Sequence, residues 1–332
     1  MKALIQKLVE TTGPSGYEDV IRGVIENEIK AYASDIRVDP LGNLIARIGE
    51  KKEGGKRIML PAHMDEIGLI ATHIDDNGFI RFTSIGGVRA ASTLGNRVRF
   101  MNGVQGVIGS ERASDPGKVI PLTSLFIDVG ATSKEDCPIK VGDVASFNLP
   151  MLDLGKRLSS KAMDDRVAVA VLIETLKQIK STPNELYFVF SVQEEVGLRG
   201  ATTSAYDVDP EIGISVDVTL TGDTPKGVKM EVGLGKGPTV KVRDGGMLSD
   251  PRLVRLLSEE AESQGIPYQL EILEGGTTDA RAMQVTRAGV PVCCVSVPCR
   301  YVHSQVEMVD IDDVENAVKL LVSFLSKPVA LP

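Results

Sequence analysis

The chain is most easily understood from an apolar run and the acidic pair behind it: Leu186-Tyr187-Phe188-Val189-Phe190-Ser191-Val192, then Gln193-Glu194-Glu195. An uninterrupted aromatic and β-branched run predicts a buried strand. In an open α/β sheet, ligands and catalytic groups collect in the loop after such a strand. Two adjacent carboxylates there repel each other unless a proton, a cation or a metal lies between them. The alternative is a solvated acidic pair at the start of a surface helix.

Size and composition indicate a two-domain globular protein. The chain has 332 residues, of which 42% are hydrophobic and 25% charged. This length exceeds one typical core. A net charge of −8 argues against a nucleic acid or an anionic membrane as partner. Residues 1–7 contain no apolar leader and no run reaches membrane-spanning length, so we expect a cytoplasmic location. The four cysteines form no CxxC pair, and we expect buried reduced thiols.

The two ends of the chain alternate between helices and strands. Strands are predicted at 36–38, 43–48, 57–62, 186–192, 212–216, 239–242, 268–272 and 290–297. Helices are predicted at 4–9, 21–29, 165–179, 251–264, 278–288 and 314–325. Ser15 and Glu18 have the spacing of a capping box, and Ser249 or Asp250 is the expected cap of the helix at 251–264. This alternation predicts an α/β fold with a mostly parallel sheet flanked by helices.

The character of the sequence changes between residues 67 and 158. This region has no strong helical period, and short β-like runs recur at 69–74, 79–82, 98–100, 103–108, 125–129 and 144–147. We therefore predict a small all-β domain at 67–158, inserted into an α/β catalytic domain made of 1–66 and 159–332. Inserted modules of this kind often mediate assembly. His73 lies in this region, and we expect it at a surface or an interface.

Acids and histidines follow several of the predicted strands. They are His63 and Asp65 after the strand at 57–62, Glu194 and Glu195, Asp217, and His303, with Asp164 and Asp165 opening the helix after Lys161-Ala162-Met163. If these strands share one parallel sheet, their carboxyl ends share one edge, and the side chains converge there. Imidazole and carboxylate ligands suit zinc, cobalt or manganese. Two such metals can polarise a carbonyl and generate hydroxide together, and a further carboxylate then moves the proton.

Each residue also has a simpler interpretation. His63 could be a satisfied core histidine, although His-x-Asp after an apolar strand is typical of a metal ligand whose second N–H is accepted by the Asp, here Asp65. The acids at 164 and 165 could stabilise a helix N-terminus. Asp217 could belong to a turn at the end of its strand, and His303 to an ordinary loop.

The joint pattern resembles the M42 family of dinuclear metallo-aminopeptidases, relatives of glutamyl and leucyl aminopeptidases that form tetrahedral dodecamers. The matching segments span nearly the whole chain: Gly13-Pro14-Ser15-Gly16-Tyr17-Glu18, Ala62-His63-Met64-Asp65-Glu66-Ile67-Gly68, Lys161-Ala162-Met163-Asp164-Asp165-Arg166, Gln193-Glu194-Glu195-Val196-Gly197-Leu198-Arg199-Gly200, Asp217, Gly275-Gly276-Thr277-Thr278-Asp279-Ala280 and Arg300-Tyr301-Val302-His303-Ser304. Each is weak alone, but their order and content together are specific.

The resemblance implies a role for each site residue. His63 and Asp217 would bind one metal, Glu195 and His303 the other, and Asp164 would bridge the two. Spacing alone does not separate Asp164 from Asp165. Glu194 would be the general base. From its spacing to His63, and not from the resemblance, we also expect Asp65 among the catalytic residues, as the group that orients His63. The inserted domain would assemble dimers into a hollow dodecamer that admits only peptides able to enter.

The expected function is removal of N-terminal residues from short peptides by a hydroxide bridging two divalent metals. A related two-metal deacylase acting on N-acyl amino acids is the alternative. A non-catalytic assembly protein with a vestigial site is a third possibility, but all the expected ligands and the base are present. A glycosidase is disfavoured, since it needs two free carboxylates and no metal. The native metal, the preferred N-terminal residue and the oligomeric state stay open.

Overall fold

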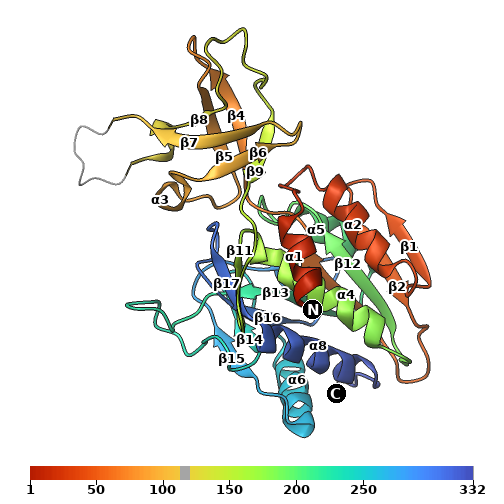
Figure 1. Ribbon diagram of the computed structural model, residues 1–332. Coiled ribbons are helices and arrows are strands. Elements are labelled where there is room, and N and C mark those ends of the chain that lie inside the picture. Colours follow the sequence, from red (N-terminus) through yellow and green to blue (C-terminus); the bar gives the residue numbers. More distant parts are fainter. Residues whose placement is uncertain (113–119, 332) are drawn as a thin grey trace.

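A computed structural model describes residues 1–112 and 120–331 of the chain. Figure 1 shows a larger α/β body that contains both termini and a smaller β body beside it. Within the described residues, no helix combines the length and the apolar character needed to cross a membrane.

The larger body is built on one sheet. Its strands are β1 Asp35–Val38, β2 Leu44–Ile48, β3 Arg57–His63, β10 Leu152–Leu154, β11 Arg157–Ser160, β12 Glu185–Ser191, β13 Ile212–Thr219, β14 Thr239–Arg243, β15 Gln269–Ile272, β16 Val292–Arg300 and β17 Glu307–Asp310. They are ordered β1-β2-β12-β3-β13-β16-β17-β11-β10, and β14 pairs with both β15 and β16.

The sheet is mixed, so the expected mostly parallel arrangement holds only for its centre. Strands β12, β3, β13 and β16 are parallel neighbours. Strands β1, β2, β17, β11 and β10 pair antiparallel along the two edges, and β14 runs antiparallel to β16. Short connections account for the antiparallel pairs β1/β2, β10/β11 and β16/β17, because a tight turn such as the one at Asp39–Asn43 can join only antiparallel strands. The strands β10, β11 and β17 were not predicted, since each has only 3 or 4 residues.

Helices cover both faces of the sheet. One face carries α1 Lys2–Glu10, α2 Asp19–Ile29, α4 Met163–Gln178, α6 Pro251–Gln264 and α8 Ile311–Leu325; the other carries α5 Arg199–Val208 and α7 Asp279–Gln284. Along β12, Phe188 and Phe190 pack into the apolar cluster on the first of these faces. Val189 packs into the cluster on the face that carries α5 and α7. Because both faces are buried, the strand shows no polar alternation, which explains the continuous apolar run in the sequence.

The smaller body is a closed antiparallel barrel. Its strands are β4 Gly68–Ile74, β5 Ile80–Ile85, β6 Arg97–Phe100, β7 Gln105–Ser110, β8 Leu125–Asp128 and β9 Val144–Phe147, ordered β4-β5-β8-β7-β6-β9. A short helix α3 Ala90–Thr93 and a 3-10 turn at Leu122–Ser124 connect them. The barrel has its own apolar cluster, which includes Phe100 and Ile127. His73 is exposed on β4.

Candidate active site

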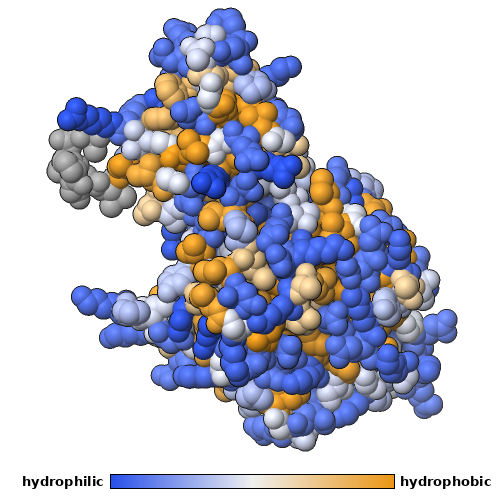
Figure 2. Space-filling view, in the orientation of Figure 1, coloured by the Kyte–Doolittle hydropathy of each residue, from blue (hydrophilic) through white to orange (hydrophobic). Residues whose placement is uncertain are grey.

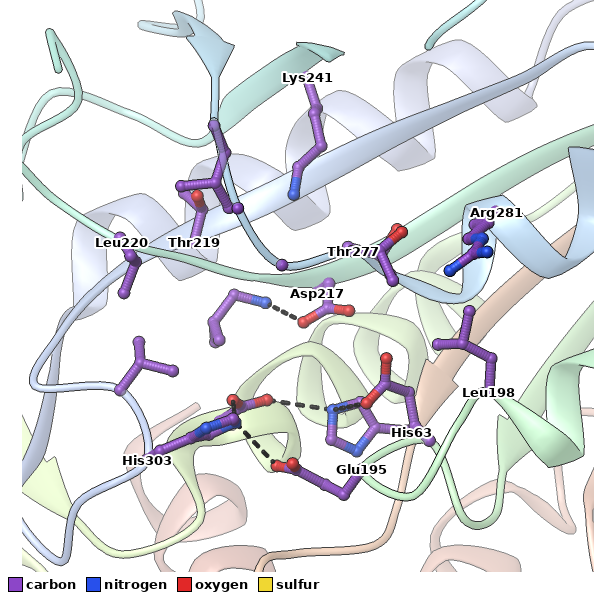
Figure 3. Close-up of a pocket in the computed structure, with 18 of the residues that line it drawn as sticks. His63, Glu195, Leu198, Asp217, Thr219, Leu220, Lys241, Thr277, Arg281 and His303 are labelled. Carbon is purple, nitrogen blue, oxygen red and sulfur yellow. Dashed lines mark hydrogen bonds and ion pairs between the residues drawn. The ribbon is translucent and has the colours of Figure 1, made fainter. Parts of the chain in front are cut away.

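The side chains that were expected to converge do lie together at the carboxyl edge of the central strands (Figure 3). His63 is the last residue of β3, Asp217 lies within β13, and His303 follows β16. A single cavity of about 840 Å³ is lined by six of the predicted residues: His63, Asp164, Glu194, Glu195, Asp217 and His303. Asp65 does not line this cavity.

Asp164 lies between the two histidines. Its Oδ1 is 3.0 Å from His63 Nε2 and its Oδ2 is 3.3 Å from His303 Nε2. Glu195 Oε1 is 3.2 Å from the same His303 nitrogen, as the dashed lines in Figure 3 show. The ligand atoms of His63, Asp164 and Glu195 all lie within 4.8 Å of one another. This arrangement is compact enough for one metal ion and leaves Asp164 in contact with both imidazoles.

Asp165 has a different environment from its neighbour, to which it is joined by a cis peptide bond. Its ligand atom groups with those of His63 and Asp217, again within 4.8 Å. It is buried, and within the described parts of the chain neither of its carboxylate oxygens has a hydrogen-bond partner. The two aspartates that spacing could not separate therefore occupy distinct positions, and only Asp164 contacts both histidines.

The cluster carries more negative charge than its neighbours neutralise. Burial, and then the charge of Asp217, raise the pKa of Asp165 well above its ordinary value. Burial likewise raises the pKa of Glu194, and that of Asp217 to about 8. Although burial lowers it, hydrogen bonds to Asp164 and Glu195 raise the pKa of His303 to about 11. Buried carboxylates that repel one another in this way are suited to a divalent cation that supplies the missing positive charge, and the imidazole and carboxylate donors fit zinc, cobalt or manganese.

Asp65 holds the acidic loop in place. Its Oδ1 accepts a hydrogen bond from Glu194 N at 3.0 Å, and its Oδ2 accepts one from Glu195 N at 3.2 Å. His63 Nδ1 lies 3.1 Å from the Asp65 backbone oxygen and 3.4 Å from Oδ1. The expected orientation of His63 by Asp65 thus involves the backbone carbonyl more closely than the carboxylate. Asp65 contacts the acidic loop and His63 and does not itself line the cavity.

The capping box predicted from Ser15 and Glu18 does not form. The α2 helix has no side-chain cap, and Ser15 Oγ instead donates to Asp65 Oδ2 at 2.6 Å. Glu18 Oε1 accepts from Gln193 N at 3.1 Å. Both side chains therefore form hydrogen bonds with residues distant in the sequence, next to the loop of Glu194 and Glu195, and not with the N-terminus of their own helix. Their segment was recognised as a motif, but spacing alone did not show these partners. At α6, by contrast, Asp250 is the cap, as expected.

Glu307 and Asp279 were not predicted as site residues. Glu307 is buried on β17 and accepts hydrogen bonds from the backbone of both Asp164 and His303. No motif surrounds it, so only the structure places it there. Asp279 begins α7 and accepts a hydrogen bond from Ser191 Oγ at 2.5 Å. It lies in the Gly275–Ala280 segment, which matches the M42 family but was given no site role in the sequence analysis.

The rest of the cavity lining is less acidic. It includes the apolar residues Leu198 and Leu220, the hydroxyl-bearing residues Thr219 and Thr277, and the cations Lys241 and Arg281, all labelled in Figure 3. Lys241 Nζ lies 3.1 Å from Glu271 Oε1, so its charge has a buried partner. This part of the lining offers room for a small organic group next to the acidic cluster.

The fold and the cluster together define a class: an α/β enzyme whose cavity contains buried histidine and carboxylate groups that could hold a metal ion. Residues 42–320 match the model of the M42 glutamyl aminopeptidase family. The chain is 48% identical to a candidate aminopeptidase of Acetivibrio thermocellus. The alignment covers 96% of this chain and 96% of the relative.

Two archaeal proteins extend the comparison. A lysyl aminopeptidase of Pyrococcus furiosus is 37% identical, over 98% of this chain and 96% of the relative. The structure of the Pyrococcus horikoshii TET1 peptidase, which can assemble into a tetrahedron or a large octahedral shell, superimposes with a TM-score of 0.90 at 36% identity over 99% of both chains. The chain belongs to the M42 peptidase family, as the sequence motifs indicated.

Proposed function

We propose that the chain is a metal-dependent aminopeptidase that removes N-terminal residues from short peptides. The observation that carries this proposal is the position of Asp164 between His63 and His303 in a cavity that also contains Glu194. Family membership supports the same reaction class.

In this proposal, five side chains hold two divalent metals. His63 and Asp217 belong to one ion, Glu195 and His303 to the other, and Asp164 to both. The contacts of Asp164 with both imidazoles support its choice over Asp165 as the shared ligand. Two metals bound here would polarise the scissile carbonyl and lower the pKa of a bound water.

Glu194 is proposed as the general base. Its Oε2 lies 3.9 Å from His63 Nε2, so it borders the cluster. Burial raises the pKa of Glu194, which favours a carboxyl group that takes up a proton and releases it again. Glu194 would accept the proton of the attacking water and deliver it to the departing amine, while Asp65 fixes its backbone.

We also propose that the barrel within residues 67–158 is an assembly domain that joins dimers into a dodecamer; β10 and the start of β11 fall in the same range but belong to the larger sheet. The barrel has its own apolar core, and the TET1 relative forms shells of many copies. Light scattering coupled to size-exclusion chromatography tests this point. A mass near twelve chains supports the assembly, and a monomer at micromolar concentration contradicts it.

A substrate panel tests the activity. Peptides with a free N-terminus should be cleaved from that end in the presence of Co²⁺ or Zn²⁺, and the same peptides with an acetylated N-terminus should be spared. Cleavage of N-acyl amino acids instead would favour the deacylase. No chelator-sensitive hydrolysis of either set would contradict the proposal.

A further inference from the structure

The candidate ligands differ in how the backbone holds them. His63 and Asp217 lie in the regular strands β3 and β13, whose parallel hydrogen bonds fix them. Asp164 and His303 lie in irregular segments: Asp164 has non-helical φ/ψ angles at the start of α4, and His303 has a positive φ of 61°. One half of the site is therefore built on rigid strands and the other half on turns, which need additional support.

Glu307 supplies a connection between these two irregular segments. Its Oε2 accepts a hydrogen bond from Asp164 N at 3.0 Å, and its Oε1 accepts one from His303 N at 2.7 Å. The side chain is buried, with 1% of its surface exposed. Glu307 itself begins β17, where it pairs with Ser160 of β11. The carboxylate is therefore attached to the sheet, and both irregular segments are attached to the carboxylate.

We infer that Glu307 is a positioning residue that sets the spacing between Asp164 and His303, and thereby the affinity for the ion on the His303 side. This inference rests on the proposed function. Hydrogen bonds from backbone N–H groups to a buried carboxylate are among the stronger ones in proteins. The 3.3 Å approach of Asp164 Oδ2 to His303 Nε2 depends on where the two backbones are held. Asp65 has the corresponding task for the loop of Glu194 and Glu195.

The variant Glu307→Gln tests the inference. The amide keeps the size of the side chain, but one oxygen becomes an NH₂ group that faces a backbone N–H and cannot accept from it. Titration of the metal-free full-length protein with Co²⁺ alone, followed by calorimetry, measures both binding steps. We expect the Kd of one of the two binding steps to rise by about 10- to 100-fold, the usual effect of losing a hydrogen-bond partner of a metal ligand, and the Kd of the other step to stay within about twofold.

Asp313 offers a matched control. Its Oδ1 and Oδ2 accept hydrogen bonds from Gly237 N and Gly235 N, both at 2.7 Å, and it is buried on α8 away from the cavity. Asp313→Asn makes the same chemical change to a carboxylate with the same two kinds of partner. It should lower the melting temperature and leave both Co²⁺ affinities unchanged.

The outcomes separate the inference from the proposed function. If wild-type protein binds two Co²⁺ and Glu307→Gln loses affinity for one of them, the inference is supported. Unchanged affinities, or an equal loss at both steps, overturn it. If Glu307→Gln does not fold, the same Co²⁺ titration is carried out on Glu307→Asp. The aspartate keeps the negative charge, but its side chain is too short to reach both N–H groups. Fewer than two Co²⁺ on the wild-type protein would instead contradict the proposed metal site.

Discussion

The barrel and the α/β body differ in whether they bury charged side chains. Among the described residues of the barrel strands and their connections, no charged side chain is buried. The α/β body buries many charged groups: His63, Asp65, Glu66, Asp164, Asp165, Arg166, Asp217, Lys241, Glu271, Asp279, Glu307, Asp310 and Asp313. Burying a charge is costly unless it is paired, hydrogen-bonded or bound to a metal. The contrast locates the chemistry in the α/β body and leaves the barrel as a region stabilised mainly by apolar packing.

Metal removal should show this contrast most strongly. A chelator should abolish peptide hydrolysis and destabilise the α/β body, because the crowded carboxylates lose their counter-charge; an ion present at 100 times its Kd contributes about 2.7 kcal/mol. Hydrogen exchange should accelerate around His63 and His303 and stay unchanged in the barrel. Equal acceleration of hydrogen exchange in both regions would show that the metals do not stabilise the α/β body selectively.

Replacing the proposed base should remove most of the activity without removing the metals. Glu194→Gln is expected to lower kcat by about 10²- to 10⁴-fold, the usual contribution of general acid–base catalysis. Metal content by mass spectrometry should equal that of the wild type. Asp76→Asn, in the exposed β4–β5 turn, is the barrel control and should keep full activity. Near-normal turnover in Glu194→Gln would show that another group moves the proton.

Core truncations test whether each region is stabilised by its own packing. Phe188→Ala removes a fully buried ring of β12, and Ile127→Ala removes a fully buried side chain of β8. We expect losses of about 3–5 kcal/mol and 2–5 kcal/mol respectively, since both leave cavities. Denaturant unfolding combined with hydrogen exchange should place the first loss in the α/β body and the second in the barrel. A loss of protection around His63 in Ile127→Ala would show that the two regions are energetically coupled.

The smallest expected effect is a pH dependence at Glu18. Burial raises the pKa of Glu18 to about 7 from an ordinary value of 4.5. A raised carboxyl pKa contributes stability that is fully present below 4.5 and is lost as pH rises through about 7. Unfolding free energies at pH 5 and pH 8 should therefore differ more for the wild type than for Glu18→Gln, by roughly 3 kcal/mol at most. The same difference in both proteins would show that Glu18 does not titrate in this range.

Much of the fold could be read from periodicity. The buried strands β3 and β12 and the six barrel strands lie close to their expected positions, because apolar runs and turn residues mark them clearly. Strand direction at the sheet edges was harder, since it depends on connections and on short strands such as β11 and β17 that carry little pattern. The helix expected at 278–288 ends at Gln284, where a turn from Met283 to Thr286 replaces it.

The site residues also divide into those that the sequence predicted and those that only the structure revealed. His63, Glu195, Asp217 and His303 lie near or just after the carboxyl ends of strands, so topology alone brings them to one edge. The different positions of Asp164 and Asp165 could be seen only in the structure. Because the two residues are adjacent, their sequence separations from the other site residues are nearly the same. Glu307 could not be found from sequence, since its role depends on hydrogen bonds from the backbone N–H groups of Asp164 and His303, which no residue pattern around Glu307 indicates.

The position of bound metal is the most direct test of the account. Crystals soaked in Zn²⁺ and measured at the zinc absorption edge should show two anomalous peaks in each cavity, about 3.5–4 Å apart. One should lie between His63 and Asp217, the other between Glu195 and His303, and Asp164 should contact both. A single peak, a shared ligand at Asp165, or peaks outside this cluster would contradict it.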